Sequence, residues 1–309
     1  MHRTLELTVP PAATNALRDE LIALEDVIGL TVQRGASAKP AGDVLVVHVL
    51  NKGANEVLRR ARAAVPEKNA LSVVTSEATS FISPASHHII DTDRDEAIWE
   101  EMESGLRHQG RITTNYLLLM GLGGLIAAVG LVSEPVPQAV AFVASAIIAP
   151  GFDSMTKVPL GLVLKRWPLV WHGLKSALAG YAVLVLTAAL TMALLVAVGE
   201  TSAAKLAANP EVEHLAHPKW MELLMAGAGA LAGVVILAAF RRSFQAGPLI
   251  AMAFIPAAAL IGAGLAVGHL DLALEGLERF GADWGFIVAL GVPFLWLKQM
   301  LLHKRQPLV

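Results

Sequence analysis

The sequence contains no cysteine. Disulfide bonds, catalytic thiols and cysteine-ligated zinc or iron–sulfur sites are therefore excluded. Charged residues are also scarce, at 16% of the 309 positions, whereas soluble proteins average roughly 25%. The formal net charge is −2, so the chain lacks the basic excess typical of nucleic-acid binding, and we expect no nucleic-acid partner.

Hydrophobic residues are abundant, at 55% of the chain, with a mean hydropathy of +0.57. The excess lies after Thr113, whereas roughly the first hundred residues have ordinary polarity. This shift predicts a soluble domain followed by a membrane domain. The first eleven residues are followed by a polar segment and not by the apolar core of a signal peptide, which predicts that the soluble domain stays in the cytoplasm.

Residues 1–80 predict a small α+β domain. Strands are expected at 4–9, 27–34, 43–50 and 70–76, and helices at 12–26 and 53–65. The order β-α-β-β-α-β is the ferredoxin-like split βαβ pattern. Two roles stay open for it, because this fold hosts many functions: a ligand-sensing or dimerising module, or a domain that holds subunits together.

Residues 81–111 form a predicted connector. It is polar and irregular as far as residue 92, and Asp93 with Glu96 then forms a capping box for a helix at 94–109. Ile98, Trp99, Met102 and Leu106 give this helix an apolar stripe. Such a helix can lie in the lipid headgroup plane or pack on the soluble domain.

Residues 112–309 predict a polytopic α-helical membrane domain with about six spans. The expected spans are 113–132, 136–166, 171–198, 220–240, 246–267 and 284–302. With six crossings, four basic clusters fall on one side: Arg107 with Arg111, Lys165 with Arg166, Arg241 with Arg242, and His303 to Arg305. The positive-inside rule then places both termini in the cytoplasm and the protein in the inner (plasma) membrane. The segment from Gly268 to Asp283 is expected as a polar outer loop.

The second span is interrupted by Pro150 and Gly151, and it carries Asp153 and Lys157. A backbone break within lipid must be buried in protein or line a wet cavity, and an ionisable residue in a span indicates a functional site. In the functional interpretation, Asp153 binds a cation or proton, Lys157 is its counter-ion or contacts an anion, and Ser154 adds an oxygen. Alternatively, Asp153 and Lys157 pair only to close the break, or Lys157 reaches the cytoplasmic surface.

Among the other polar residues of the spans, Asn115 is the strongest candidate to join this site. No metal site is expected.

The chain also carries a candidate internal repeat. Residues 161–174 and 264–277 share five identities, and Pro150 matches Pro256 if a shift of three residues is allowed. These segments close the second and fifth spans, which run in opposite directions. This arrangement predicts a 3+3 inverted repeat with broken helices. In transporters, such repeats place the substrate site at the interface between the two halves.

Several of these segments together resemble a known family, the bacterial and archaeal "uncharacterised hydrophobic domain" family, domain of unknown function number three hundred and eighty-nine. The resemblance rests on Trp99–Met102, Asn115–Met120, Ile126–Leu131, Ile148–Pro150, Gly161–Leu162 and Ile255–Pro256, in that order. It implies a multi-span membrane protein and supplies no catalytic residues. Members of the family commonly have an uncharged Leu-Met-Gly-Pro run after Ala149-Pro150. The charged run found here implies a subgroup, or a charge-based mechanism that does not extend to the whole family.

The leading functional hypothesis is a transporter or channel for a small solute or ion, with its site around Pro150 and Pro256. The alternative is a membrane-anchored sensor or regulator that acts through the ferredoxin-like domain. An intramembrane enzyme is disfavoured, because the sequence contains neither H-E-x-x-H nor G-x-S-x-G and only one buried aspartate is expected. We therefore expect no enzymatic activity and no cofactor. The expected partners are the lipid bilayer and a small solute or ion, and assembly into a homo-oligomer is left open.

Overall fold

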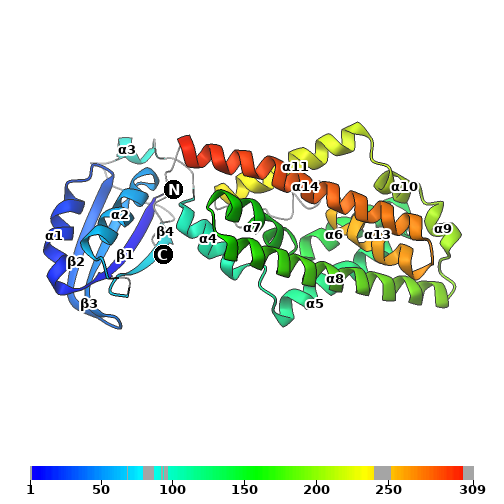
Figure 1. Ribbon diagram of the computed structural model, residues 1–309, viewed down its shortest axis with the longest axis horizontal. Helices are drawn as coiled ribbons and strands as arrows, with labels where there is room; N and C mark the ends of the chain where they lie inside the picture. Colours follow the sequence, from blue (N-terminus) through cyan, green and yellow to red (C-terminus); the bar gives the residue numbers. More distant parts are fainter. Residues whose placement is uncertain are drawn as a thin grey trace. The chain divides into compact units, whose positions relative to one another are not determined.

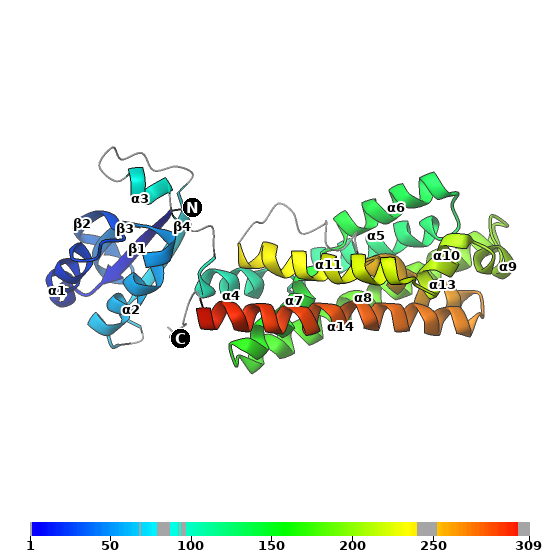
Figure 2. The same ribbon diagram turned by 90° about the horizontal axis from the view of Figure 1, so that it is seen from above.

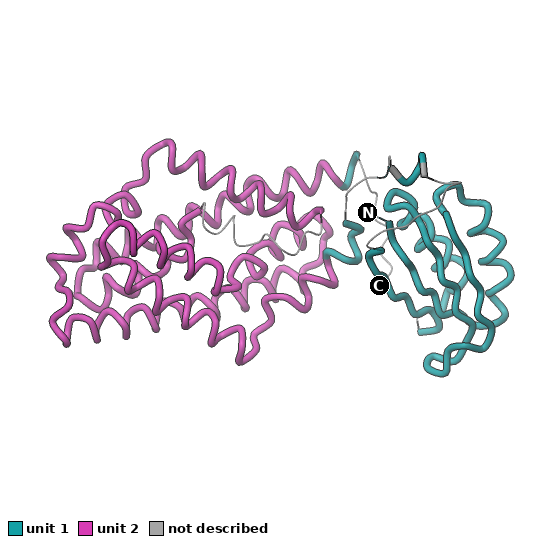
Figure 3. Tube along the Cα trace, turned by 180° about the vertical axis from the view of Figure 1, so that it is seen from behind, with its two compact units in different colours: residues 1–102, 299–309 teal, residues 103–298 magenta. Residues whose placement is uncertain are grey.

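The structure is a computed structural model that describes residues 2–67, 69–78, 87–91, 93, 97–239 and 252–301. It consists of two compact units (Figure 3). The first contains residues 1–102 with 299–309, and the second contains residues 103–298. Each unit is described separately below.

The first unit is built on a four-stranded antiparallel sheet with the order β2-β3-β1-β4. The chain order is β1 (Arg3–Val9), α1 (Pro11–Ile22), β2 (Val27–Ala38), β3 (Ala41–Val49), a single 3₁₀ turn (Asn51–Gly53), α2 (Ala54–Ala64) and β4 (Ser72–Glu77). The predicted succession of strands and helices is confirmed. The expected loop at 35–42 is wrong in part, because β2 and β3 continue into it as a hairpin.

Alternation along the strands explains how this sheet buries one face. Leu5, Leu7 and Val9 of β1 are buried, and so are every second residue of β3 and the inner faces of α1 and α2. Because side chains alternate between the two faces of a strand, this pattern places both helices on one face.

Polar and charged side chains are also buried in this unit. The Asp43 carboxylate accepts hydrogen bonds from the Gly35 N–H (2.8 Å) and the Thr14 hydroxyl (2.7 Å), which hold the pKa of this carboxyl below its usual range. Arg3 forms a buried ion pair with Glu101 (2.9 Å).

Residues around 77–92 were expected to be irregular, but His87–Asp91 forms a short helix, α3. Glu96, and with it the predicted capping box, lies outside the described residues.

The second unit is helical (Figures 1 and 2). Its helices are α4 (Trp99–His108, which begins in the first unit), α5 (Thr114–Gly130), α6 (Pro135–Ile148), α7 (Phe152–Val163), α8 (Trp167–Ala197), α9 (Ala203–Ala207), α10 (Pro210–Ala216), α11 (Trp220–Ala238), α13 (Phe254–Ala266) and α14 (Leu270–Leu301). Three of them, α8, α11 and α14, are long and apolar enough to cross a membrane. The bent pair α6–α7 makes a fourth if it is counted as one span, whereas α5 and α13 are apolar but shorter.

One expectation for this unit is wrong. The sequence predicted a polar outer loop at 268–283 and a span that begins at Trp284, but α14 is continuous from Leu270 to Leu301. The reason is that Asp283 is spaced four residues from Arg279, so that the two charges compensate each other inside one helix (3.4 Å). The predicted basic residues Arg241, Arg242 and His303–Arg305, and the first part of the fifth predicted span (246–251), lie outside the described residues.

Two helical hairpins in this unit have matching bounds. One hairpin consists of α7 and α8, and the other of α13 and α14. Their first helices end at Val163 and Ala266, which are 103 residues apart (266 − 163 = 103). Their second helices begin at Trp167 and Leu270, which are also 103 residues apart (270 − 167 = 103). The chain direction is opposite in the two, because α8 and α14 run antiparallel, as the sequence colours show (Figure 1).

The turns of the two hairpins also match bond by bond. After α7, Lys165 is left-handed (φ +54°), and the Arg166 N–H donates to the Gly161 carbonyl (2.7 Å). After α13, Gly268 is left-handed (φ +74°), and the His269 N–H donates to the Gly264 carbonyl (2.9 Å). This is the Schellman ending of a helix at positions 103 apart.

Small residues set how closely the paired helices approach. A Cβ on Gly173 of α8 would lie 2.8 Å from the Ser154 carbonyl oxygen of α7, and a Cβ on Gly276 of α14 would lie 2.9 Å from the Ala257 carbonyl oxygen of α13. Ser154 and Ala257 are again 103 residues apart. The two hairpins therefore share one packing geometry.

Candidate functional site

The predicted break between α6 and α7 is present. The two helices meet at an angle of 54° across Ala149, Pro150 and Gly151. Ala149 is extended (ψ 112°), and its carbonyl accepts the Gly151 N–H (2.9 Å). Proline has no N–H to continue the helix of α6, and its ring disfavours a helical conformation of the residue before it. The chain therefore restarts as a new helix at Phe152.

The tyrosine Tyr181, which the sequence analysis did not select, lies against this break. A Cβ on Gly151 would lie 2.1 Å from its hydroxyl oxygen, so the hydroxyl touches the backbone at the start of α7. The ring packs on Phe254 of α13 (centroids 5.5 Å apart) and on Phe280 of α14 (4.8 Å). Tyr181 thus lies where α7, α8, α13 and α14 meet.

The hydroxyl of Tyr181 is buried and has no hydrogen-bond partner within the part of the chain that the structure describes. Such groups are rare in proteins, because a buried polar group without a partner costs about 1–3 kcal/mol. They point to a role that the resting contacts do not explain. The sequence signal was available, since the chain has two tyrosines and this one stands in the middle of an apolar span.

The other tyrosine, Tyr116 of α5, has its hydroxyl fully engaged. It lies 3.1 Å from the Ser154 hydroxyl and donates to the Ser176 carbonyl (2.9 Å). Ser154, predicted to contribute an oxygen to the site, is buried in this contact. Its contacts join α5, α7 and α8, and its hydroxyl also lies against Gly110 in the α4–α5 link.

Asp153 and Lys157 both lie buried on α7, at 7% and 2% exposure. They do not form an ion pair. The Lys157 ammonium instead donates to the Gly110 carbonyl (2.9 Å), in the link between α4 and α5. The close ion pair considered for these residues is therefore absent, although the two charges interact electrostatically, and the ammonium is held at the α4–α5 link.

Two further residues that were predicted to join the site, Asn115 and Pro256, are not placed as expected. Asn115 lies in the first turn of α5 and is exposed. Pro256 is buried in the first turn of α13, where a proline is compatible with a helix, so it stands inside the helix and not between two helices as Pro150 does. With the hairpins aligned at 103 residues, Pro256 corresponds to Asp153.

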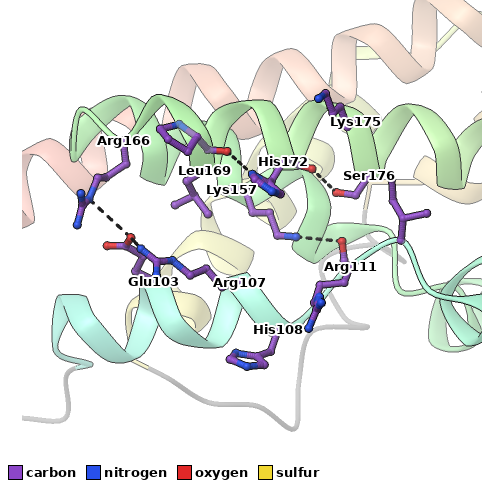
Figure 4. Close-up of a pocket in the computed structure, with 13 residues that line it drawn as sticks. Glu103, Arg107, His108, Arg111, Lys157, Arg166, Leu169, His172, Lys175 and Ser176 are labelled. Atoms are coloured by element: carbon purple, nitrogen blue, oxygen red, sulfur yellow. Dashed lines mark hydrogen bonds and ion pairs between the residues drawn. The ribbon is translucent and has the colours of Figure 1, made fainter. Parts of the chain in front are cut away.

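A cavity of about 620 Å³ lies beside α7, between α4, the α4–α5 link and the first turns of α8 (Figure 4). Basic side chains dominate its lining. They are Arg107, Arg111, Lys157, Arg166 and Lys175, with His108 and His172. Glu103 is the carboxylate among the described lining residues, and it pairs with Arg107 and with Arg166 (3.6 Å).

A second buried charge pair lies on α14. Arg279 and Asp283 are 5% and 0% exposed, and the Arg279 Nε lies 3.4 Å from the Asp283 carboxylate. The sequence analysis placed both residues outside the membrane. Asp283 is three residues from Phe280, which packs on Tyr181, so this pair lies within one helical turn of the aromatic cluster at the break.

Comparison with known proteins gave one family. Residues 146–289 match the family model described as "Domain of unknown function (DUF389)". The match begins just before the break and ends within α14, so it covers the first hairpin and the second as far as residue 289, and it confirms the resemblance drawn from the sequence. No curated protein matches the chain.

Proposed function

Residues 146–289 match the DUF389 family, whose function is unknown, and from the geometry of the break we propose that the protein is a membrane transporter or channel for a small solute or ion. Its site is the region around Pro150, Gly151 and Tyr181, with Pro256 on the facing helix α13. The proposal assigns no catalytic reaction to the protein.

The proposed topology has six crossings, made by α5, the pair α6–α7, α8, α11, the predicted fifth span at 246–267 to which α13 belongs, and α14. Short helices are acceptable in such an arrangement where they are broken or shielded by protein. The side that carries Arg107, Arg111, Lys165 and Arg166 is then cytoplasmic by the positive-inside rule, as are both termini, in the inner membrane. The N-terminal unit is the cytoplasmic head, with a ferredoxin-like fold supported by its antiparallel order β2-β3-β1-β4.

We propose further that the two halves of the membrane unit are inverted repeats. Three features support this: the constant spacing of 103 residues, the shared Schellman endings, and the opposite direction of α8 and α14. The cross-packing agrees as well. Gly262 of α13 packs on α8 at Val185, and Pro159 of α7 packs on α14 at Gly291, with 262 − 159 = 103. In transporters, such repeats hold the substrate site at their interface, beside helices broken within the membrane.

The observation that carries the proposal is the buried Tyr181 hydroxyl at the start of α7. The N-terminus of a helix has free N–H groups and a partial positive charge. Together with a hydroxyl that has no described partner and the nearby carboxylate of Asp153, it offers polar contacts in an otherwise apolar region. A permeating solute or ion would supply the partner that Tyr181 lacks.

The test is a current measurement on vesicles that contain the full-length protein. Solid-supported membranes would be exposed to jumps of pH, NaCl, KCl and potassium phosphate. We expect a transient current in at least one jump, and a reduction of at least tenfold in Tyr181→Phe and in Asp153→Asn. Trp171→Phe, an aromatic change on the exposed side of the same helix, should leave the current unchanged.

Vesicles that respond to none of the four jumps would contradict transport. Unchanged currents in both Tyr181→Phe and Asp153→Asn would place the pathway elsewhere. The absence of any current would favour the alternative, a sensor or regulator that acts through the head.

A further inference from the structure

The cavity beside α7 combines a defined volume with an excess of positive charge. Five arginine and lysine side chains line it, against the single carboxylate of Glu103 among the described lining residues. That carboxylate is already engaged by Arg107 and Arg166. Within the described residues, neither Arg111 nor Lys175 has an ion-pair partner. A concave wall with unbalanced cations attracts an anion.

One of these cations is buried. Lys157 is 2% exposed, and its ammonium uses one hydrogen bond, to the Gly110 carbonyl. An ammonium has three N–H donors, so this contact holds the group in place and leaves capacity for a ligand. Asp153 interacts electrostatically with this ammonium but forms no ion pair with it, and an anion in the cavity would offset more of the cost of burying the charge.

The exposed residues around the cavity indicate at which level of the lipid bilayer the cavity opens. Trp167 and Trp171, in the first turns of α8, are 63% and 61% exposed, and they alternate with the lining residues Pro168, His172 and Lys175. Exposed tryptophans at the end of an apolar helix are typical of the level of lipid headgroups. Basic pockets between helices at that level bind anionic headgroups.

We propose that this cavity is a binding site for a phosphate group, carried by an anionic phospholipid or by a soluble phosphate compound. Arg111, Lys157 and Lys175 supply the charge, and Gly110 fixes the position of Lys157. The site is separate from the break at Tyr181 and does not depend on transport.

The experiment uses the full-length protein in a neutral detergent and separates the two sources. In one arm, native mass spectrometry counts bound phosphatidylglycerol and, as the zwitterionic reference, phosphatidylcholine. In the other arm, thermal unfolding is followed in potassium phosphate against potassium chloride of equal ionic strength. The test variant is Arg111→Gln with Lys175→Gln, two exposed positions. The matched control is Lys205→Gln with Lys219→Gln, which removes the same charge between α8 and α11.

We expect wild type and control to bind phosphatidylglycerol in preference to phosphatidylcholine, and the test variant to bind it about tenfold or more weakly, because two cations near the headgroup are lost. A shift in unfolding temperature by phosphate alone, lost in the same variant, would identify a soluble phosphate as the ligand. Equal binding in test and control variants, or no response of wild type to either ligand, would overturn the proposal.

Discussion

The hairpins α7–α8 and α13–α14 have the same backbone bounds and the same turn, but their polar residues differ. At positions 103 apart, Ser154 and Lys157 in the first hairpin correspond to Ala257 and Leu260 in the second. Conversely, Ser176 and Gly180 in the first correspond to Arg279 and Asp283 in the second. Small residues where the helices cross are common to both and set the geometry, whereas the charges were placed independently. The two hairpins therefore share a backbone scaffold but not the polar groups that could do chemistry on it.

The largest effect is expected at the shared crossings. Gly173→Val and Gly276→Val would each press a side chain against a backbone oxygen of the facing helix, less than 3 Å away. Overpacking of this kind costs about 3 kcal/mol. Both variants should lose most of their thermal stability in detergent, measured by fluorescence-detected size exclusion after heating. Gly285→Val, where the added atoms meet open space, is the control. A neutral Gly276→Val would show that the two crossings are not equivalent.

The next effect concerns a charge that only one hairpin has. Arg279→Met leaves Asp283 buried without its cation, which should lower stability by about 2 kcal/mol. The double variant Arg279→Met with Asp283→Leu should recover most of this loss. Ser176→Ala, at the position that corresponds to Arg279, should change stability by less than about 1 kcal/mol. Chemical denaturation in mixed micelles measures all three. An Arg279→Met protein as stable as wild type would mean that the pair does not hold α14 in place.

A smaller effect separates the two tyrosines near the break. Tyr116→Phe removes a hydroxyl with two partners and should cost about 1–2 kcal/mol. Tyr181→Phe removes a hydroxyl without a described partner, and its unfolding temperature should equal that of wild type or exceed it. Thermal unfolding of the two variants side by side decides the point. A clear loss in Tyr181→Phe would reveal a structural bond at that hydroxyl.

The smallest effect lies at the turns. Lys165 and Gly268 hold the same left-handed conformation, which costs a residue with a Cβ about 1 kcal/mol. Lys165→Gly should therefore stabilise the protein by up to about 1 kcal/mol, and Gly268→Lys should destabilise it by a similar amount. Opposite shifts in the unfolding midpoint support the equivalence of the turns. Shifts of the same sign would argue against it.

The sequence predicted those features that depend on local pattern. Strands of the head follow from alternation, and the break follows from Pro150, because a missing N–H and a ring clash act on the nearest residues. The correspondence of the two hairpins was also visible, through the glycines at 161, 173, 264 and 276.

Features that depend on distant contacts were not predictable in this way. Tyr181 is conspicuous as one of two tyrosines in the chain, but no local pattern predicts that it meets Gly151, 30 positions away. The charge of Asp283 by itself predicts a loop. Its pairing with Arg279, one helical turn earlier, is what allows it to be buried within a continuous helix. The cavity is formed by four separate segments, so no single segment carries its signal.

The contact between Gly151 and the Tyr181 hydroxyl has a consequence for evolution. With 2.1 Å between a hypothetical Cβ and the hydroxyl oxygen, the two positions cannot enlarge independently. Chains of the same domain that carry a larger residue at the position of Gly151 should carry a smaller one at that of Tyr181. The two columns of a family alignment should therefore covary, although 30 residues separate them.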